Sequence, residues 1–212
     1  MTDAKAALRK LMQERRMRLD PLYARGASKD IARRVMELPE FRAARAVLCY
    51  MAMKHEVQTD AILEAAWQTG KRVAVPAQVQ GGEYHPAWIR EEERMVAARF
   101  GLREPVAPEW AQAASFDVLI LPGVVFSPAG GRIGHGRGYI DRMLVRLGVG
   151  RGCKVGLCFQ CQMAESVPVS DQDVPMDVVV TEDAVFRRAE RQGGMCVTAT
   201  GCGPEEKGDA IC

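Results

Sequence analysis

Short apolar runs separated by amphipathic stretches make up most of the chain. Runs of this kind, bounded by turn residues, predict buried strands. The predicted strands cover residues 46–51, 72–75, 117–121, 154–159 and 177–181, with a further candidate at 84–89. A helical pattern fills the interval between the first two, so strand, helix and strand follow one another within about 30 residues. This order is typical of a βαβ unit with parallel strands.

Three stretches have the spacing of amphipathic helices. Residues 4–19 carry an apolar stripe, with basic side chains on another face. A second helix is expected to begin near Ser28, a residue type that caps helix starts, and to end at Pro39. A third is expected to follow Thr59 as its cap and to stop at Gly70.

The remaining segments are less regular. Pro76 is expected to close the second strand, and residues 101–105 are expected to form a turn. Residues 160–176 contain two prolines and are predicted to be mostly loop. Beyond about Arg188 the chain has no periodicity, which is typical of a disordered tail.

Composition fits this organisation. The chain has 212 residues, a net charge of +2, 48% hydrophobic and 26% charged residues, as expected for one globular α/β domain. We assign that domain to residues 1–188 and the tail to residues 189–212. No apolar run approaches the roughly 20 residues that a membrane helix needs. The first residues are charged, so a cytoplasmic setting is expected. The protein is also expected to be a monomer. Seven cysteines at irregular spacing argue against a disulfide framework.

The most informative stretch runs from residue 117 to residue 147. Its strand ends at Pro122-Gly123, a glycine-rich loop follows, and an amphipathic helix comes next. The glycines are Gly130, Gly131, Gly134, Gly136 and Gly138. Such a backbone can turn sharply and bring several N–H groups to one anion, and the helix dipole favours negative charge at the same place. With Arg132 and Arg137 nearby, the stretch predicts phosphate binding, although a tight connection is the alternative; it is neither a Walker loop nor a GxGxxG motif.

Several charged side chains could serve such a ligand or only the fold. Lys5 and Arg9, one helical turn apart, either lie on a solvated face or reach one anion. Asp141, in the first turn of the helix after the loop, either complements the helix dipole or binds Mg²⁺ beside phosphates. Asp173 and Asp177 flank a proline, where a turn-forming role is the default.

Further polar residues lie where ligands or metals could bind. Glu56 follows a buried strand, and α/β proteins bind ligands beyond the carboxyl ends of parallel strands, but a solvated loop carboxylate is the alternative. His135 is either a neutral loop residue or a polar contact to a substrate. Cys158 and Cys161 form a CxxC motif, but a zinc site needs two more ligands and a redox pair favours a helix start, so two ordinary thiols are expected.

Together these residues resemble the 5-formyltetrahydrofolate cyclo-ligase family, also called methenyltetrahydrofolate synthetases. The most specific part is Leu121-Pro-Gly-Val-Val-Phe126 followed by Gly131-Arg-Ile-Gly-His-Gly-Arg-Gly-Tyr-Ile-Asp-Arg142, which is similar to the family's PGxxFD…GxRLGxGxGYYD pattern. Supporting matches are Lys5-x-x-x-Arg9, Glu56-Val-x-Thr59 and the Gln162…Pro168…Asp173 spacing. The resemblance runs from Lys5 to about Glu182.

This resemblance implies a three-layer α/β/α sandwich around a mainly parallel sheet, and an ATP-dependent ring closure. In that reaction 5-formyltetrahydrofolate becomes 5,10-methenyltetrahydrofolate, and ADP and phosphate are released. The implied ATP contacts are Lys5, Arg9, Arg132, Gly134, His135, Gly136, Arg137 and Gly138, and the implied Mg²⁺ ligands are Asp141 and Asp173. The implied folate contacts are Met51, Glu56, His135 and Tyr139, and the implied catalytic residues are Arg132, Arg137 and Asp141.

The chain departs from the family pattern at three places. Ser127 stands where the family usually has Asp, and Ile140 replaces the second Tyr of Tyr-Tyr-Asp. Gln160 and Cys161 fall where an acidic or aromatic residue is commoner. Two other functions stay open. One is a non-catalytic relative that binds nucleotide or nucleic acid through the basic first helix, although a net charge of only +2 makes nucleic acid an unexpected partner. The other is an ATP-dependent enzyme that acts on a different small amide-bearing substrate.

Overall fold

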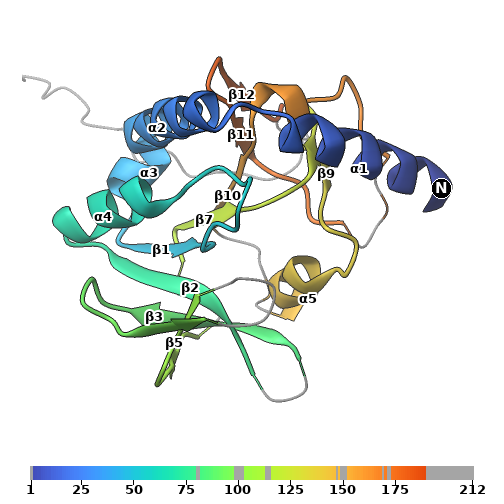
Figure 1. Ribbon diagram of the computed structural model, residues 1–212. Helices are drawn as coiled ribbons and strands as arrows, with labels where there is room; N and C mark the ends of the chain where they lie inside the picture. Colours follow the sequence, from blue (N-terminus) through green and yellow to red (C-terminus); the bar gives the residue numbers. More distant parts are fainter. Residues whose placement is uncertain are drawn as a thin grey trace, which may run out of the picture.

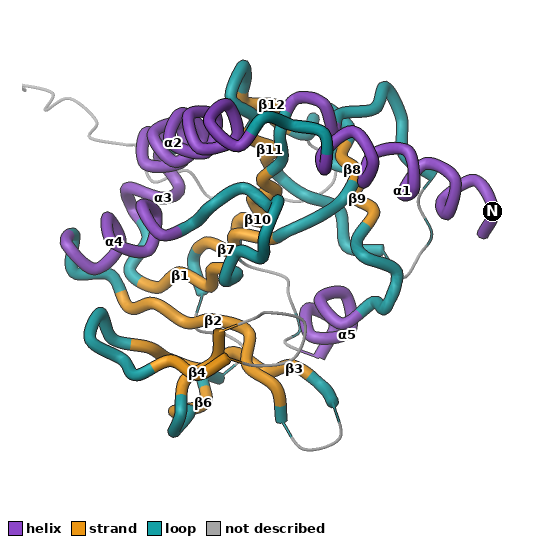
Figure 2. The backbone as a smooth tube through the Cα atoms, viewed as in Figure 1, coloured by secondary structure: helices purple, strands orange, loops and turns teal. Residues whose placement is uncertain are grey.

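The structure, a computed structural model, describes residues 2–79, 82–97, 103–112, 116–146, 148, 152–168, 170 and 173–189 (Figures 1 and 2). The helices are α1 (Thr2–Met17), α2 (Pro21–Glu37), α3 (Pro39–Ala43), α4 (Asp60–Gln68), α5 (Tyr139–Arg146) and the 3₁₀ helix η3 (Gln160–Gln162). The strands are β1 (Ala46–Cys49), β2 (Arg72–Gln78), β3 (Tyr84–Ile89), β4 (Met95–Ala97), β5 (Arg103–Pro105), β6 (Glu109–Trp110), β7 (Val118–Leu121), β8 (Val125–Phe126), β9 (Arg132–Ile133), β10 (Cys153–Leu157), β11 (Val178–Val180) and β12 (Val185–Arg187). The predicted tail beyond residue 189 lies outside the described residues, so its disorder stays a prediction.

The main sheet is mostly parallel, as the βαβ pattern predicts. Its strand order is β12-β11-β10-β7-β1-β2-β3-β6. The five strands from β11 to β2 pair in parallel, and the antiparallel partners are β12 on one side and β3 with β6 on the other. The two edges therefore differ from the parallel centre, where crossovers connect β1 to β2, β7 to β10 and β10 to β11.

Helices cover both faces of the sheet. Alternate residues of one strand enter different cores: Val118 and Ile120 of β7 pack with α2, α3 and α4, whereas Leu119 and Leu121 pack with Met143 and Leu144 of α5. Figure 1 shows α2, α3 and α4 together on one side and α5 on the other. This arrangement confirms the predicted three-layer α/β/α sandwich in a single domain.

Helix α2 covers one face of the sheet (Figure 1) and begins earlier in the chain than the sequence predicts. The prediction that Ser28 caps this helix is wrong, because Asp20 lies eight positions earlier and its Oδ1 accepts the N–H groups of Leu22 at 2.8 Å and Tyr23 at 3.0 Å. Ser28 is instead buried inside α2, where its hydroxyl donates to the Ala24 carbonyl at 2.7 Å. Asp20 with Pro21 at the first helical position is the stronger start signal.

Two positions predicted to interrupt or lie outside strands are in fact part of strands. Pro76 does not close β2; it pairs with Pro86 of β3. It lies beyond residues 72–74, where β2 pairs with β1, so its missing N–H breaks no ladder bond on that side. Likewise, Arg103–Pro105 forms β5 against β4 rather than a turn; residues 101–102 of that prediction lie outside the described part.

The sequence did not indicate five other short strands. β8 and β9 form a hairpin within the glycine-rich stretch, β12 returns antiparallel to β11, β4 pairs with β5, and β6 pairs with β3. Each is only two or three residues long, which is too short for periodicity to be recognised. The segment 160–176 is mostly loop in its described part, as predicted, apart from η3.

The order of the strands fixes where a ligand can bind. After β1 the chain adds β2 on one side and β7 on the other. In open α/β sheets the connections diverge at such a position and leave a crevice beyond the carboxyl ends of the strands. The residues after Cys49 of β1 and after Leu121 of β7 therefore border this crevice.

Candidate active site

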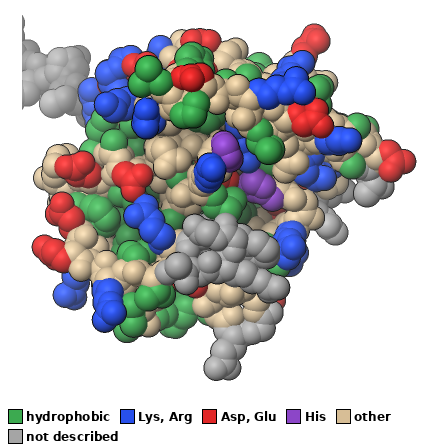
Figure 3. All heavy atoms as spheres, viewed as in Figure 1, with side chains coloured by type: hydrophobic (Ala, Val, Ile, Leu, Met, Phe, Trp, Pro, Cys, Tyr) green, Lys and Arg blue, Asp and Glu red, His purple; other side chains and the backbone are tan. Residues whose placement is uncertain are grey.

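A cavity of about 390 Å³ lies beyond the carboxyl ends of β1 and β7. It receives side chains from the segment after β1, from β2 and β3, and from the segment between β7 and α5. Nine of the predicted site residues line it: Met51, Glu56, Arg132, Gly134, His135, Arg137, Gly138, Tyr139 and Asp141. On the face shown in Figure 3, His side chains lie together with Lys or Arg side chains near the centre.

Arg132 is the buried cation of this cavity. It is the first residue of β9 in the β8–β9 hairpin, where Phe126 pairs with it in antiparallel register. Its side chain is 2% exposed, forms an ion pair with Asp141 of α5, and donates from Nη1 to the Pro122 carbonyl at 3.1 Å. Its Nε is buried and has no hydrogen-bond partner among the described residues. A buried donor without an acceptor is costly, so this site is suited to an anion.

Glycine geometry and a helix start shape the wall next to Arg132. Gly136 has φ of 98°, a conformation that other residues rarely adopt. Arg9 of α1 donates from Nε to the Gly134 carbonyl at 2.9 Å, and its guanidinium lies against Gly136. An α-helix begins with backbone N–H groups that make no bond inside the helix, and α5 begins directly after this loop. These features are typical of an anion-binding loop.

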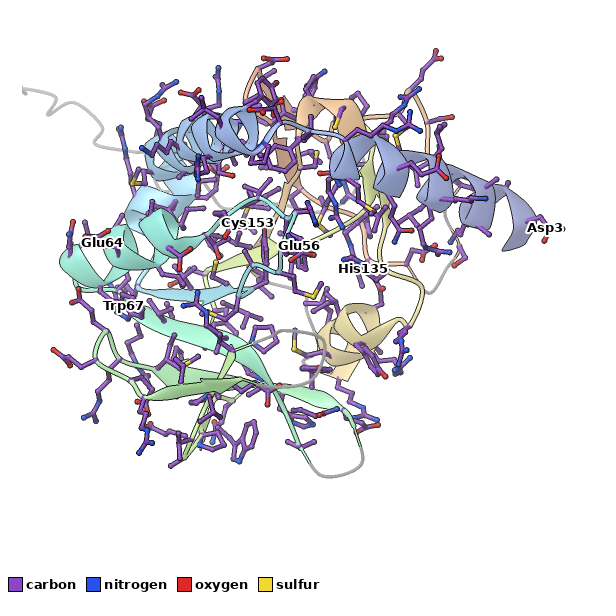
Figure 4. The ribbon with its side chains drawn as sticks, in the orientation of Figure 1. Asp3, Glu56, Glu64, Trp67, His135 and Cys153 are labelled. Atoms are coloured by element: carbon purple, nitrogen blue, oxygen red, sulfur yellow. The ribbon has the colours of Figure 1, made fainter. Side chains whose placement is uncertain are left out.

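Glu56 and His135 lie close together and both line the cavity (Figure 4). Glu56 Oε1 lies 2.9 Å from His135 Nε2, and Glu56 Oε2 accepts the Met53 N–H at 2.9 Å. The Glu56 side chain is only 4% exposed, whereas that of His135 is 35% exposed. The turn that delivers Glu56 places His55 at φ of 68°, in the left-handed region. This contact joins the segment after β1 to the glycine-rich loop.

Aromatic and thioether groups form the apolar part of the wall. The Tyr84 and Tyr139 rings lie 5.3 Å apart at 57°, and Met51 and Met53 line the same cavity. Tyr50 donates its hydroxyl to the Val57 carbonyl at 2.8 Å. Burial, and then the charge of Glu56, raise the pKa of Tyr50 well above its ordinary value, so this phenol stays neutral.

Lys5 and Asp173 form a separate ion pair that does not line the cavity. Asp173 also accepts hydrogen bonds from Ser170, at 2.6 Å from the backbone N–H and 2.8 Å from the hydroxyl. Partial burial raises the pKa of Asp173, but the hydrogen bonds from Lys5 and Ser170 outweigh it and lower that pKa below its ordinary value. The pair ties α1 to the segment before β11.

The described residues do not enclose a metal ion by themselves. No group of three or more His, Cys, Asp or Glu side chains with suitable spacing occurs in the described part of the chain. Asp141 and Asp173 each have a basic partner and are each about one quarter exposed, at 23% and 24%. Two separate carboxylates suit Mg²⁺ only if phosphate oxygens and water supply the remaining ligands.

The CxxC motif has the properties of two ordinary thiols. Cys49, Cys153, Cys158 and Cys161 are free. Burial, and then the Glu182 carboxylate, raise the pKa of Cys158 and of Cys161. Raised pKa values leave little thiolate at neutral pH, so neither sulfur is set up as a nucleophile or a metal ligand.

Several lining residues were missed by the sequence reading. They are Tyr50, Met53, Pro76, Tyr84, Pro122 and Ile140. Pro76 and Tyr84 belong to the β2–β3 hairpin. The sequence prediction ended the first of these two strands at Pro76 and gave the second, residues 84–89, only as a candidate. Continuing β2 through Pro76 to the strand at 84–89 would have brought Tyr84 over the carboxyl end of the sheet.

Comparison with known proteins identifies the family. The model of the 5-formyltetrahydrofolate cyclo-ligase family matches residues 1–182. The 5-formyltetrahydrofolate cyclo-ligase of Escherichia coli strain K12 is 30% identical over 185 residues, covering 83% of this chain and 99% of that protein. The Saccharomyces cerevisiae protein of the same name is 32% identical over 179 residues, covering 74% of this chain and 84% of that one.

Solved structures agree in fold. The solution structure of Aquifex aeolicus 5,10-methenyltetrahydrofolate synthetase superposes with a TM-score of 0.78 at 31% identity, covering 92% of this chain and 96% of that one. The Mycoplasma pneumoniae 5,10-methenyltetrahydrofolate synthetase has a TM-score of 0.67 at 23% identity, over 84% and 98% of the two chains, and supports the fold alone. None of the helices in the described residues is long and apolar enough to cross a membrane. The matching family model, the relatives and the shared fold together show that this chain belongs to the 5-formyltetrahydrofolate cyclo-ligase family.

Proposed function

We propose that this protein converts 5-formyltetrahydrofolate to 5,10-methenyltetrahydrofolate at the expense of ATP, with release of ADP and phosphate. Family membership gives the reaction class. The observation that carries the proposal is the cavity itself, which is lined by a buried arginine, whose Nε has no partner among the described residues, and by a buried glutamate. One wall suits phosphates and the other suits a flat, polar-edged ring system.

The chemistry explains why ATP is needed. The oxygen of an amide is a poor leaving group until it carries a phosphoryl group. Its attack on the γ-phosphate gives a phosphorylated imidate, which the second nitrogen of the substrate can then close into a ring. Negative charge builds up on phosphate oxygens in both steps, so positioning and charge neutralisation supply most of the catalysis.

The phosphate side of the cavity is assigned to the glycine-rich loop and the basic residues around it. Arg132 and Arg137, with the backbone N–H groups of residues 134–138, would hold the phosphates, and His135 belongs to this stretch. Arg9 supports the loop through its bond to Gly134 at 2.9 Å, and Lys5 lies one turn away on α1. We propose Lys5 and Arg9 as further ATP contacts, with Lys5 released from Asp173 when ATP binds.

Asp141 and Asp173 are the proposed Mg²⁺ ligands. They would hold a Mg²⁺ ion that supplies positive charge to neutralise the phosphates of ATP. Asp141 lines the cavity beside Arg132, which supports its role more directly than that of Asp173, whose contacts are to Lys5 and Ser170. Asp141→Asn is expected to reduce turnover by more than about 100-fold without changing the circular dichroism spectrum. Normal turnover in this variant would remove Asp141 from the metal site.

The folate side is assigned to Met51, Glu56, His135 and Tyr139. A reduced pterin has N–H groups along one edge, and a buried carboxylate such as Glu56 is a strong acceptor for them. Tyr139 and its neighbour Tyr84 offer aromatic surface at 5.3 Å from each other. Ile140, where the family pattern has Tyr, lines the same cavity through an apolar side chain, so binding there does not need the hydroxyl.

The proposal is tested by direct assay. Purified protein is incubated with 5-formyltetrahydrofolate, ATP and Mg²⁺, and formation of the methenyl chromophore is followed in the near ultraviolet. Parallel samples lack ATP, or contain EDTA. ATP-dependent formation of the chromophore supports the proposal, and its absence with correctly folded protein sinks it. Turnover of ATP with another amide substrate but not with the folate would instead favour a different amide-activating enzyme.

We propose the cytoplasm as the working compartment and the monomer as the working form. Free thiols at Cys49, Cys153, Cys158 and Cys161 suit a reducing compartment. Light scattering on the purified protein tests the oligomeric state, and a dimeric mass at micromolar concentration would contradict it.

A further inference from the structure

Ring closure requires a proton acceptor. In the proposed reaction the attacking nitrogen begins as N–H and forms a bond to the activated formyl carbon. The carbon–oxygen bond then breaks, and the oxygen leaves with the phosphoryl group as phosphate. The product nitrogen has no hydrogen, so its proton must pass to a base when the N–H bond breaks. The departing phosphate gains a proton, so a group that takes the proton from nitrogen can pass it on to phosphate or to water.

We propose that His135, held in place by Glu56, is the base that accepts this proton. The inference rests on the proposed function, because it concerns a step of that reaction. Glu56 Oε1 and His135 Nε2 are 2.9 Å apart. A carboxylate only accepts hydrogen bonds, so in the neutral imidazole Nε2 carries the proton and donates it. Nδ1 is then left with a lone pair that can accept a proton from the substrate.

The position of the pair fits this role. Glu56 and His135 are 79 positions apart in the chain, yet both line the cavity that also contains Arg132. Glu56 is 4% exposed and has a second hydrogen bond from Met53 N–H at 2.9 Å, so its carboxylate is fixed. His135 is 35% exposed, which gives the accepted proton a route to water. A buried carboxylate that orients a more exposed histidine is an arrangement that activates bases in other enzymes.

Other titratable groups around the cavity are less suited. Arginine does not give up its proton, which excludes Arg9, Arg132 and Arg137. Asp141 is paired with Arg132, and Tyr50 is kept neutral by burial. Tyr84 and Tyr139 are phenols, whose ordinary pKa is near 10. Glu56 itself is the remaining competitor, and the test must separate it from His135.

His135→Gln makes that separation. A glutamine amide can donate to Glu56 from nearly the same place as Nε2, but it has no basic lone pair. The rate of methenyl formation in a single turnover is expected to fall by at least about 100-fold, while KM for the folate changes by less than about threefold. His135→Ala should lose the same step and regain rate when imidazole is added. His85→Gln is the matched control, because His85 lies on β3 with its ring 6.2 Å from Trp110 and does not line the cavity.

A pH profile adds a second readout. A base acts only in its unprotonated form, so the single-turnover rate of the wild type should show an acidic limb along which it rises with pH. This limb should be absent from the residual rate of His135→Gln. Glu56 bonds His135, Arg9 lies against Gly136 next to it, and Arg132, Arg137, Asp141 and Tyr50 line the same cavity.

The possible outcomes are distinct. A large loss in His135→Gln at unchanged KM, with imidazole rescue of His135→Ala, supports the inference. A rate in His135→Gln within threefold of the wild type, with loss confined to Glu56→Gln, overturns it and leaves Glu56 as the base. In that case the wild type still makes the methenyl product, so the proposed function stands. A folded wild type that makes no methenyl product overturns both.

Discussion

Two cavities lie at opposite ends of the same sheet, and they differ in an instructive way. The proposed active site is beyond the carboxyl ends of β1 and β7 and has a volume of about 390 Å³. The second lies at the amino-terminal end of β2, where Arg72 and Val73 meet Ile89 of β3, and has a volume of about 670 Å³. The second is larger and also carries several charges, yet its charges are used differently.

In the second cavity the charged groups are exposed or serve the fold. Arg72 is exposed and stacks over the Trp88 ring at 3.9 Å. The Lys71 ammonium donates to the carbonyls of Arg42 at 3.2 Å and Ala44 at 2.9 Å. Glu109 is exposed to solvent. Water solvates such groups well, so they gain little from a ligand.

In the proposed active site, by contrast, charges are buried before any ligand arrives. Counted over the whole residue, Arg132 is 4% exposed and Glu56 is 5% exposed, and the Arg132 Nε lacks an acceptor among the described residues. These groups are already removed from water in the folded protein. A complementary ligand therefore gains the full free energy of pairing with them and does not have to desolvate them first. Volume alone is therefore a poor guide to function, and buried polar groups from distant segments are a better one.

The largest expected effect separates the two cavities directly. Arg132→Met keeps a long apolar side chain but removes the buried cation, and kcat/KM should fall by about 100- to 1000-fold, as when one donor is lost from a site of developing negative charge. Arg72→Met in the second cavity should change kcat/KM by less than about twofold. Both are measured by the methenyl assay at a temperature well below unfolding. Equal losses in the two variants would show that the comparison is mistaken.

The same contrast applies to the carboxylates. Glu56→Gln removes a buried charge whose oxygens bond His135 and Met53, each at 2.9 Å, and kcat/KM should fall by about 10- to 100-fold, because charged hydrogen bonds contribute about 1.5–3 kcal/mol. Glu109→Gln, an exposed carboxylate beside the second cavity, is the control and should behave as the wild type. An unchanged kcat/KM in Glu56→Gln would remove this residue from both substrate binding and catalysis.

Much of this site could be predicted from the sequence because its parts are local. The strand, the glycine-rich loop and the helix at 117–147 follow one another along the chain, and each has its own pattern. Parallel strands place their carboxyl ends at one edge, so Glu56 after β1 could be expected near that loop. The contact between Glu56 and His135 agrees with this expectation.

The rest depended on tertiary structure that no spacing encodes. The ion pair of Lys5 and Asp173 joins residues 168 positions apart. Pro76 looks like a strand end, but it is tolerated because β2 has no β1 partner at that position. Ser28 looks like a cap, but Asp20 with Pro21 forms the actual helix start and leaves Ser28 in the core. The ion pair thus depends on a distant partner and Pro76 on the limited pairing of β2 with β1, whereas the start of α2 follows a local signal stronger than Ser28.

A smaller effect is expected at Ser127, which supports the hairpin that carries Arg132. Its buried Oγ accepts the Gly131 N–H at 3.1 Å, and its backbone N–H donates to the Gly131 carbonyl at 3.0 Å. Ser127→Ala removes the acceptor of the buried Gly131 N–H and should lower the free energy of unfolding by about 1–2 kcal/mol. Ser127→Asp, the residue usual in the family at this position, keeps an acceptor and should lose less. If urea unfolding shows the aspartate variant to be the less stable one, the hydroxyl acts through something other than this bond.

The smallest expected effect concerns the ion pair beside the site. Asp173→Asn removes the charge that holds Lys5, and because the Asp173 side chain is 24% exposed the loss in unfolding free energy at pH 7 should be only about 1 kcal/mol. Asp30→Asn, from an ion pair on α2 with 57% exposure, is the matched surface control and should lose less than about half as much.

The pH dependence gives this last prediction its sign. The pKa of Asp173 is lower in the folded protein than its ordinary value, so the carboxylate stabilises the fold wherever it is ionised in both states. The difference in stability between wild type and Asp173→Asn should therefore stay constant from pH 7 down to about pH 5. It should shrink below about pH 4, where the unfolded chain binds the proton first. A difference that grows on acidification would mean that Asp173 is stabilised as the neutral acid, and the link between Lys5 and the site would need another explanation.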